Sequence, residues 1–192
     1  MDSPILFVGL GNPGFRYVNT RHNIGFLFVD IIQSLCSYPE FKYDRNLAGE
    51  ISSLKTDSRE VILLKPDTYM NLSGKSVLAA ISFYNVLPQN IFVVHDDMDF
   101  DFGRQKIKIG GGSAGHNGVQ SIIDYLSNPE FYRIRLGIAK KDEERGKDFV
   151  LGLFADDEME FISAGWASRW KELFLTILED GPVKAMNLFN KA

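Results

Sequence analysis

The sequence predicts an α/β fold: a single domain with a mixed central β-sheet and helices on both of its faces. Short apolar runs typical of buried strands alternate with segments of helical spacing, a pattern that places one sheet between two helical layers. Two runs, 51–55 and 61–65, flank the turn-forming pair Asp57-Ser58 and predict a hairpin, so the sheet is mixed and not fully parallel. A chain of 192 residues suits one domain better than two, and we expect residues 1–192 to form a single domain.

The N-terminal half alternates strand and helix. Residues 5–10 form an apolar run that stops at a loop of Gly, Asn and Pro, as a buried strand does. From residue 22 to residue 35 the apolar side chains recur at helical spacing. Ser73 is a suitable N-cap for a second helix, whose apolar face extends to Tyr84.

The C-terminal half repeats this alternation. Residues 91–94 predict a buried strand that ends before an acidic turn. Residues 104–109 and 133–138 alternate basic and apolar side chains, as strands with one cationic face do, and residues 119–126 predict a short helix. A long last helix is expected to begin at Asp156-Asp157-Glu158, because acidic side chains stabilise the positive end of the helix dipole.

Composition and charge exclude several classes of protein. The net charge of −4 excludes a generally basic protein that coats DNA, although residues 103–149 carry a local excess of cations where a polyanion would bind. The one cysteine, Cys36, excludes a disulfide framework and a Cys-rich zinc module. The N-terminus lacks the basic region of a secretory signal and the apolar runs are too short to cross a bilayer, so we expect a cytoplasmic protein without a membrane anchor.

A glycine pattern follows the first strand. Gly9-Leu10-Gly11-Asn12-Pro13-Gly14 matches the motif of dinucleotide-binding proteins, and Asp30 lies at a suitable distance for the ribose-binding acid, which makes a nicotinamide-dependent oxidoreductase one alternative. Two details weigh against it: the helix is delayed to about His22, and Asp30 lies inside a helical pattern instead of ending a strand. The simpler interpretation is a turn that needs positive φ at its glycines.

Histidine and aspartate provide the candidate catalytic groups. His22 lies where a loop meets a helix, a position that favours the neutral imidazole that a general base needs. His95-Asp96-Asp97 follows a buried strand and is itself followed by Asp99 and Asp101. The pattern is compatible with a solvated acidic turn, with a magnesium site, or with an aspartate that orients a histidine from elsewhere in the chain.

A glycine-rich loop, residues 110–118, lies between a basic strand and a helix and is of a kind that cradles a phosphate. It lacks the Gly-Lys-Ser/Thr ending of an ATP-binding loop, so a nucleic-acid phosphate is the better candidate; charges that protect two edge strands are the structural alternative. Amides suit a site that holds a peptide-like group without ionic attraction. The loop asparagines next to these segments are Asn12, Asn71 and Asn117.

Together these segments resemble the bacterial-type peptidyl-tRNA hydrolase family. The resemblance runs in order and at suitable spacings from the first strand to about Phe154, which makes it far more specific than the glycine pattern alone. The matching segments are 8–14, 17–23, 65–74, 95–99, 110–118, 133–138 and 149–152.

The resemblance implies an enzyme that hydrolyses the ester between a peptide, or an N-blocked aminoacyl group, and the 3′-terminal ribose of tRNA. This activity recycles tRNA from peptidyl-tRNA that is released prematurely during translation. The resemblance also implies a cytosolic monomer, with peptidyl-tRNA as its partner and with no metal or organic cofactor.

The resemblance further implies roles for individual residues. His22 is the general base that activates water, Asp96 orients it, and Asn12 lies near the scissile ester, where oxyanion charge develops. The family's substrate-binding residues match a group in the cleft and a group of cations that bind tRNA phosphates. The cleft group is Tyr17, Tyr69, Met70, Asn71 and Asn117, and the cations are Lys106, Lys108, Arg133 and Arg135. The roles of His95 and His116 stay open between supporting and structural.

Two departures from the family pattern leave these groups in place. Asp97-Met98 stands where Glu-Leu is usual, and Ser113-Ala114 interrupts the glycine-rich loop. Residues 140–147 are expected to form a loop. The alternative to an enzyme is a non-catalytic RNA-binding relative on the same fold, which would act with a protein partner through an exposed apolar surface.

Overall fold

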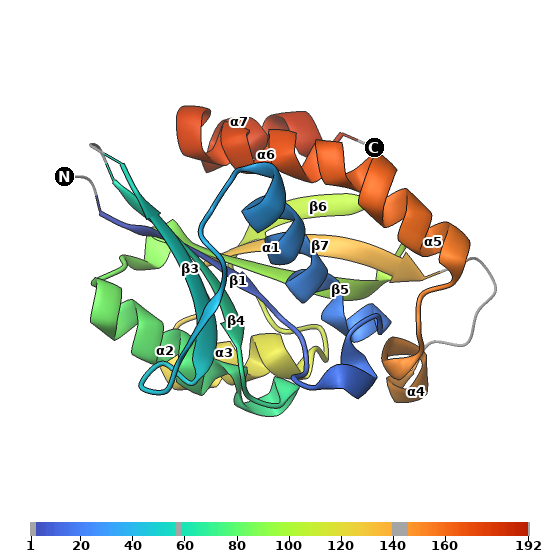
Figure 1. Cartoon of the computed structure of the whole chain (residues 1–192), viewed down its shortest axis with the longest axis horizontal. Coiled ribbons are helices and arrows are strands. Elements are labelled where there is room, and N and C mark those ends of the chain that lie inside the picture. The colour runs from blue at the N-terminus through green and yellow to red at the C-terminus, as the bar shows by residue number, and fades with distance from the viewer. Residues whose placement is uncertain (1–2, 57–58, 140–145, 192) are drawn as a thin grey trace.

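A computed structural model describes residues 3–56, 59–139 and 146–191 and confirms the α/β fold (Figure 1). Its strands form one seven-stranded sheet in the order β2-β3-β4-β1-β5-β7-β6. The strands are β1 (Ile5–Gly9), β2 (Lys42–Asp44), β3 (Gly49–Lys55), β4 (Glu60–Pro66), β5 (Ile91–Asp101), β6 (Gln105–Ile109) and β7 (Tyr132–Ala139). The α-helices are α1 (Ile24–Leu35), α2 (Ser73–Tyr84), α3 (Asn117–Leu126), α4 (Lys147–Leu151), α5 (Asp156–Glu160), α6 (Ala167–Asp180) and α7 (Pro182–Phe189).

The sheet is mixed, as expected. The central strand β1 is parallel to both β4 and β5, and β5 pairs in parallel with β7. The expected hairpin is the antiparallel pair of β3 and β4, whose turn residues Asp57 and Ser58 lie outside the described residues. β6 pairs antiparallel with β7 and forms one edge of the sheet. The parallel strands direct their carboxyl ends to one side, which is where ligands bind in α/β sheets.

Two apolar clusters cover the two faces of the sheet. The first packs α1, α6 and α7 against the sheet and includes Phe7, Phe28 and Trp170. The second lies under α2 and α3 and includes Leu6 and Val77. Leu6 and Phe7 are neighbours in β1 and point to opposite faces, which explains why this strand is apolar at every position and fully buried.

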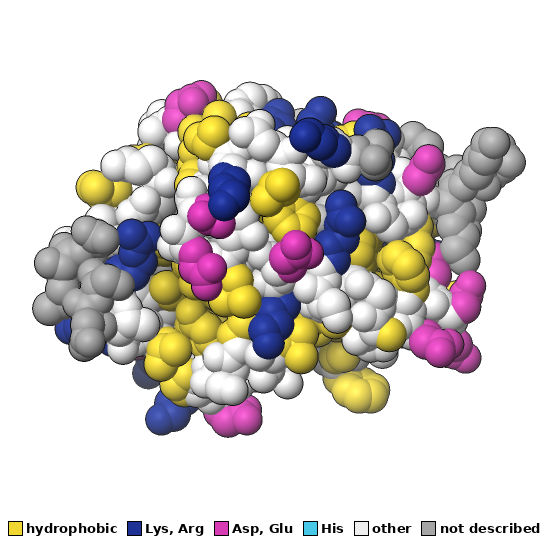
Figure 2. Space-filling model, turned by 90° about the horizontal axis from the view of Figure 1, so that it is seen from above, with side chains coloured by type: hydrophobic (Ala, Val, Ile, Leu, Met, Phe, Trp, Pro, Cys, Tyr) yellow, Lys and Arg dark blue, Asp and Glu magenta, His cyan; other side chains and the backbone are white. Residues whose placement is uncertain are grey.

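The outer surface of α6 and α7 has a mixed character. Figure 2 looks down on this side of the molecule and shows basic, acidic and apolar side chains interspersed, with no histidine visible. In the described part of the chain, no helix combines the length and hydropathy needed to cross a membrane.

The largest difference from the sequence prediction concerns β5. The strand does not end before His95 but continues to Asp101, and Asp96 and Asp97 are only 4% and 8% exposed. The interpretation as a solvated acidic turn is therefore wrong. Tertiary partners keep these carboxylates inside the sheet, because two histidines contact Asp96 and Arg135 contacts Asp97.

Helix boundaries also differ from the prediction. Ser73 is the first residue of α2 and not its N-cap, and its hydroxyl donates a hydrogen bond to the carbonyl oxygen of Met70 at 2.9 Å. The long last helix is divided into α5, a π-helical segment Phe161–Trp166 and α6, and α7 follows separately. Residues 140–145 of the expected loop lie outside the described residues, and Lys147 already belongs to α4.

Glycine allows α1 to approach β1 closely. An added Cβ on Gly9 would lie 2.2 Å from the carbonyl oxygen of Gly25, and one on Gly25 would lie 2.4 Å from the amide nitrogen of Leu10. Backbone atoms cannot move aside as the end of a flexible side chain can. Any side chain at residue 9 or 25 would therefore clash with them, and both positions require glycine. Of the three glycines in the dinucleotide-like pattern, Gly14 alone has positive φ, at 101°. The close approach places the turn that carries His22 over the carboxyl end of β1.

The structure contradicts the ribose-binding role of Asp30. This residue lies within α1 and forms an ion pair with Lys65 at 2.8 Å. Furthermore, α1 begins at Ile24, ten residues beyond the last glycine of the pattern, so this helix does not open within the glycines as it does in a dinucleotide-binding motif. The glycine pattern is therefore a turn and not a dinucleotide site.

Candidate active site

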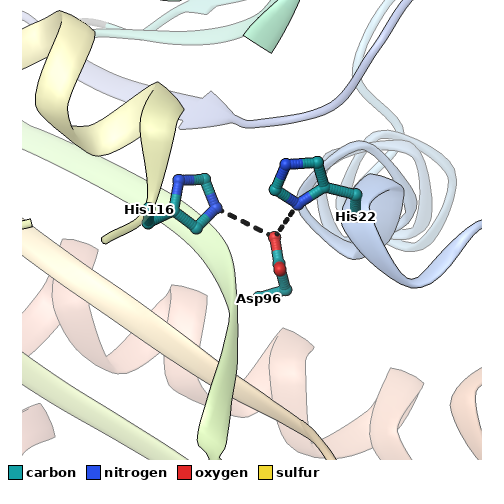
Figure 3. A group of neighbouring side chains, drawn as sticks. All are labelled: His22, Asp96 and His116. Carbon is teal, nitrogen blue, oxygen red and sulfur yellow. Dashed lines mark hydrogen bonds and ion pairs between the residues drawn. The ribbon is translucent and has the colours of Figure 1, made fainter. Parts of the chain in front are cut away.

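Three side chains from distant parts of the sequence meet near the middle of β5 (Figure 3). His22 belongs to the 3-10 turn Arg21–Asn23, Asp96 lies in β5, and His116 is the N-cap of α3. Oδ1 of Asp96 lies 2.8 Å from Nδ1 of His22 and 2.9 Å from Nε2 of His116. One buried carboxylate oxygen therefore binds two imidazole rings.

Backbone contacts fix the tautomer of His116. Its Nδ1 accepts hydrogen bonds from the amide N–H groups of Gly118 and Val119, at 3.1 and 3.3 Å. Nε2 of His116 therefore carries the proton that is donated to Asp96. His22 donates to the same oxygen from Nδ1, so the neutral ring of His22 has its lone pair on Nε2, as a general base requires.

The shared carboxylate also sets the ionisation of the site. Burial alone would raise the pKa of Asp96, but the two imidazole rings outweigh burial and hold that pKa well below its usual range. Burial alone would lower the pKa of His22, but the charge and hydrogen bond of Asp96 outweigh it and raise that pKa. Asp96 is therefore ionised, and it stabilises the imidazolium that forms when His22 accepts a proton.

His95 contacts both His116 and the backbone of Asp96. Its ring packs edge-on against His116 with centroids 4.8 Å apart, and its Nδ1 lies 2.8 Å from the carbonyl oxygen of Asp96. Burial, together with the neighbouring His116, lowers the pKa of His95 well below its usual value. His95 is thus a neutral packing partner of His116.

Asn12 is held by the residue that follows His22. The amide N–H of Asn12 donates to Oδ1 of Asn23 at 2.8 Å, and Nδ2 of Asn23 donates back to the carbonyl oxygen of Asn12 at 3.0 Å. Oδ1 of Asn12 in turn accepts from the amide N–H of Met70 at 2.9 Å. Nδ2 of Asn12 has no hydrogen-bond partner among the described residues. Sequence reasoning assigned no role to Asn23; the signals were its place beside His22 and its membership of the matching segment 17–23.

A buried ion pair fixes the turn that carries His22. Nη1 of Arg21 lies 2.9 Å from Oε1 of Glu158, and its guanidinium lies over the rings of Phe149 and Phe154. Oε2 of Glu158 accepts the amide N–H of Ala155. Sequence reasoning missed this pair, because its partners are 137 residues apart and no local pattern connects them.

We expect Arg21→Ala to lower the free energy of unfolding by about 3–5 kcal/mol, because it removes the cation that pairs with the buried carboxylate of Glu158. Urea unfolding measures the change. The matched control is Lys184→Ala, which removes an exposed pair with Asp180 and should change the free energy by about 0.5 kcal/mol or less. Equal effects of the two substitutions would show that the ion pair does not hold the turn.

A hollow of about 330 Å³ opens beside the histidines. His22, His116, Asn117 and Lys108 line it, together with part of the glycine-rich loop. Burial and the neighbouring cations, Arg133 first among them, lower the pKa of Lys108. Like charges crowded in this way are stabilised by a bound anion.

Arg133 and Arg135 differ from the sequence expectation, because both have internal partners. Arg133 is only 3% exposed, and its guanidinium donates to the carbonyl oxygens of Gly111 and Gly112, which holds the glycine-rich loop. Arg135 is ion-paired with Asp97. The cations of this group that have neither an ion pair nor a hydrogen bond with any described residue are Lys106 and Lys108 on β6.

The remaining expected residues fall into two groups. Asn117 is the first residue of α3 and lines the hollow, and Met70 is buried with its backbone bound to Asn12. Tyr17, Tyr69 and Asn71 are not among the described residues that line this hollow. Tyr69 and Asn71 are exposed in the neighbouring loop before α2.

The magnesium site that the aspartates of β5 left open as one alternative does not form among these described residues. In the described ranges, the residues that place at least three potential ligand atoms together are His22, Asp96 and His116, with those atoms within 4.8 Å of one another. A transition metal would bind there only after both rings lost the protons that they donate to Asp96.

The fold and the site are those of an α/β enzyme of the hydrolase class. The profile of the family described as Peptidyl-tRNA hydrolase matches residues 6–192. The chain therefore belongs to the peptidyl-tRNA hydrolase family.

Individual relatives agree with this assignment. The peptidyl-tRNA hydrolases of Clostridium botulinum strain Hall and Trichlorobacter lovleyi are 42% and 41% identical over 190 residues; the alignments cover 96% and 99% of this chain and 96% of each relative. The crystal structure of peptidyl-tRNA hydrolase from Acinetobacter baumannii superposes with a TM-score of 0.88 at 34% identity, covering 100% of this chain and 96% of that chain.

Proposed function

We propose that this protein hydrolyses the ester that joins a peptide, or an N-blocked aminoacyl group, to the 3′-terminal ribose of tRNA. The observation that carries the proposal is the hydrogen bond from Nδ1 of His22 to Asp96, which leaves Nε2 of His22 as a base at the edge of the hollow that Lys108 also lines. Membership of the peptidyl-tRNA hydrolase family supports the substrate class. The reaction recycles tRNA from peptidyl-tRNA released prematurely during translation, and we expect the protein to act in the cytoplasm as a single-domain monomer.

The reaction begins when Nε2 of His22 accepts a proton from water as the water oxygen attacks the ester carbonyl carbon. Asp96 stabilises the resulting imidazolium and stays ionised. Nδ2 of Asn12 donates a hydrogen bond to the carbonyl oxygen as its negative charge develops. The imidazolium then returns the proton to the ribose oxygen as the carbon–oxygen bond breaks, which releases the peptide acid and free tRNA.

Other residues bind the two parts of the substrate. Asn117 is proposed to hold the peptide group in the hollow, and the neighbouring loops contribute Tyr17, Tyr69, Met70 and Asn71. Lys106 and Lys108 bind tRNA phosphates. Arg133 acts mainly by holding the glycine-rich loop, and both Arg133 and Arg135 add positive charge next to Lys108.

We expect Lys108→Ala to weaken tRNA binding and to make its salt dependence shallower by about one unit in the slope of log K against log salt. The reason is that one phosphate contact, and the counterion that it releases, is lost. Binding titrations at several salt concentrations measure the slope. The control is Lys55→Ala in β3, because β3 lies toward the opposite edge of the sheet from β6. If Lys108→Ala keeps the native slope, this lysine does not contact phosphate.

The test of the proposed function is the release of a labelled N-acetyl-aminoacyl group from its tRNA by the purified protein, with a chelator present. Rapid release is the expected result, and it would also show that the reaction needs no accessible metal. Binding of tRNA without release would contradict the proposal and would favour the non-catalytic RNA-binding alternative.

A further inference from the structure

A second hollow, of about 420 Å³, lies between the turn after β5, the π-helical segment and the C-terminal residues. It shares no lining residue with the hollow beside His22. The peptidyl-tRNA hydrolysis proposed above makes no use of it. Its volume falls within the range of pockets that bind small molecules.

The charges in this hollow are all of one sign. Arg104, Arg169 and Lys191 line it, and no acidic residue does. None of these three cations forms an ion pair with any residue that the structure describes. Arg104 lies over the ring of Phe100 and Arg169 lies over that of Phe189, at 5.0 and 5.7 Å from the ring centroids. In a chain with a net charge of −4, three unpaired cations around one cavity favour an anionic ligand.

Unpaired polar atoms point to a ligand more strongly than the charges do. Gln105 lines the hollow and is 5% exposed, yet neither Oε1 nor Nε2 of its side chain has a hydrogen-bond partner. The indole Nε1 of Trp166, in the same wall, is also buried without a partner. The great majority of buried polar side-chain atoms are paired, because an unpaired one costs about 1–3 kcal/mol.

The position of Gln105 is well defined. It alternates along β6 with Lys106, so it faces α6, on the same side of the sheet as the buried Ile107. Asn190 closes the edge of β6 by bonding both the amide N–H and the carbonyl oxygen of Ile107, at 2.6 and 2.8 Å. These bonds hold Asn190, the residue before Lys191, against β6. The carboxamide of Gln105 and the cation of Lys191 therefore belong to one ordered site.

An aromatic surface completes the hollow. Phe161 opens the π-helical segment and is 43% exposed, and Gly165 lies beside its ring. A Cβ on Gly165 would lie 3.3 Å from that ring, so the glycine leaves the ring uncovered on this side. Single π-helical turns inside α-helices occur frequently at functional sites.

We propose that this hollow binds a nucleotide. Its phosphate lies among Arg104, Arg169 and Lys191, the edge of its base bonds the carboxamide of Gln105, and the plane of the base packs on Phe161. A carboxamide offers a donor and an acceptor side by side, as the bidentate recognition of adenine requires. Arginine is suited to phosphate, and aromatic rings stack on bases. The nucleotide is either free or part of an RNA strand, because the recognised groups are the same.

Tryptophan fluorescence tests the proposal directly. The chain has two tryptophans, Trp166 and Trp170, which stack at 5.1 Å, and Trp166 lines the hollow. We expect AMP to change this fluorescence in a saturable way when excitation is at the red edge of tryptophan absorption. Arg169→Ala should weaken the apparent affinity at least about tenfold, as expected for the loss of a charge-assisted hydrogen bond. The control Lys184→Ala should leave the affinity unchanged, and ester hydrolysis should continue in both variants.

The choice of probe distinguishes a free nucleotide from a nucleotide that is part of an RNA strand. Saturation by AMP indicates a free nucleotide, and saturation by a single-stranded RNA oligonucleotide without any response to AMP indicates a nucleotide of an RNA strand. Equal affinity for inorganic phosphate and AMP would overturn the base contact, and equal affinity for adenosine and AMP would overturn the phosphate contact. No response to any of these probes would overturn the site.

Gln105→Leu gives an independent readout. If the carboxamide is reserved for a ligand, this substitution should raise the midpoint of thermal unfolding of the unliganded protein and should also weaken AMP or oligonucleotide binding. If Gln105 has only a structural role, the substitution should lower the midpoint and leave binding unchanged, and this result would overturn the assignment of Gln105.

Discussion

His22→Ala is expected to reduce kcat for peptidyl-tRNA hydrolysis by about 10²–10⁴-fold, the usual contribution of a general base. The substitution removes Nε2, which the hydrogen bond to Asp96 leaves as the unprotonated nitrogen. Affinity for tRNA should change little, because Lys106 and Lys108 on β6 remain in place. Single-turnover release of the labelled acyl group, measured beside tRNA binding, separates the two effects.

His22→Asn is the matched variant for this prediction. Its amide group retains a donor for Asp96 but has no basic nitrogen, so it tests whether the loss comes from chemistry or from the position of the turn. We expect it to be as inactive as His22→Ala. Retained hydrolysis in either variant would show that His22 is not the base.

Asp96→Asn should lower kcat by about 10²–10⁴-fold, because the imidazolium of His22 loses the charge that stabilises it. It should also move the pH profile. The base acts when neutral, so kcat/KM rises as the pH increases through the pKa of His22. In the native protein Asp96 raises this pKa against the effect of burial. Without the charge of Asp96, burial lowers the pKa of His22. The acidic limb of the pH profile therefore moves to lower pH.

The control for this shift is Asp97→Asn. Asp97 is the next residue of β5, points to the opposite face of the sheet and pairs with Arg135 and not with His22. It should leave the acidic limb of kcat/KM in its native position. An acidic limb that stays in place or moves to higher pH in Asp96→Asn would contradict the role given to Asp96.

Local patterns in the sequence were sufficient for most of the fold. Strand β1 is apolar at every position because both of its faces are buried, and α1 shows helical spacing because one of its faces packs on the sheet. The pattern of basic and apolar residues likewise predicted β6 and β7. Each of these signals lies within a few residues of the structure that it describes.

The sequence did not predict the division of the last helix. The apolar positions around Phe161–Trp166 fit an ordinary helix, and the change to π-helical winding depends on how this segment packs. The local sequence pattern also did not predict that Asp96 lies within a strand. A carboxylate favours a turn unless distant partners compensate for its burial.

By itself, the sequence determined the α/β class, the order of most elements and the family resemblance, because periodicity and motifs are properties of neighbouring residues. The tertiary structure decided which side chains act together. The partners of Asp96 lie 74 and 20 residues away, Arg133 is bound to the glycine-rich loop, and Gln105 faces a hollow with its carboxamide unpaired. Ionisation and hydrogen bonding depend on what surrounds a group in space, and only the folded chain brings those surroundings together.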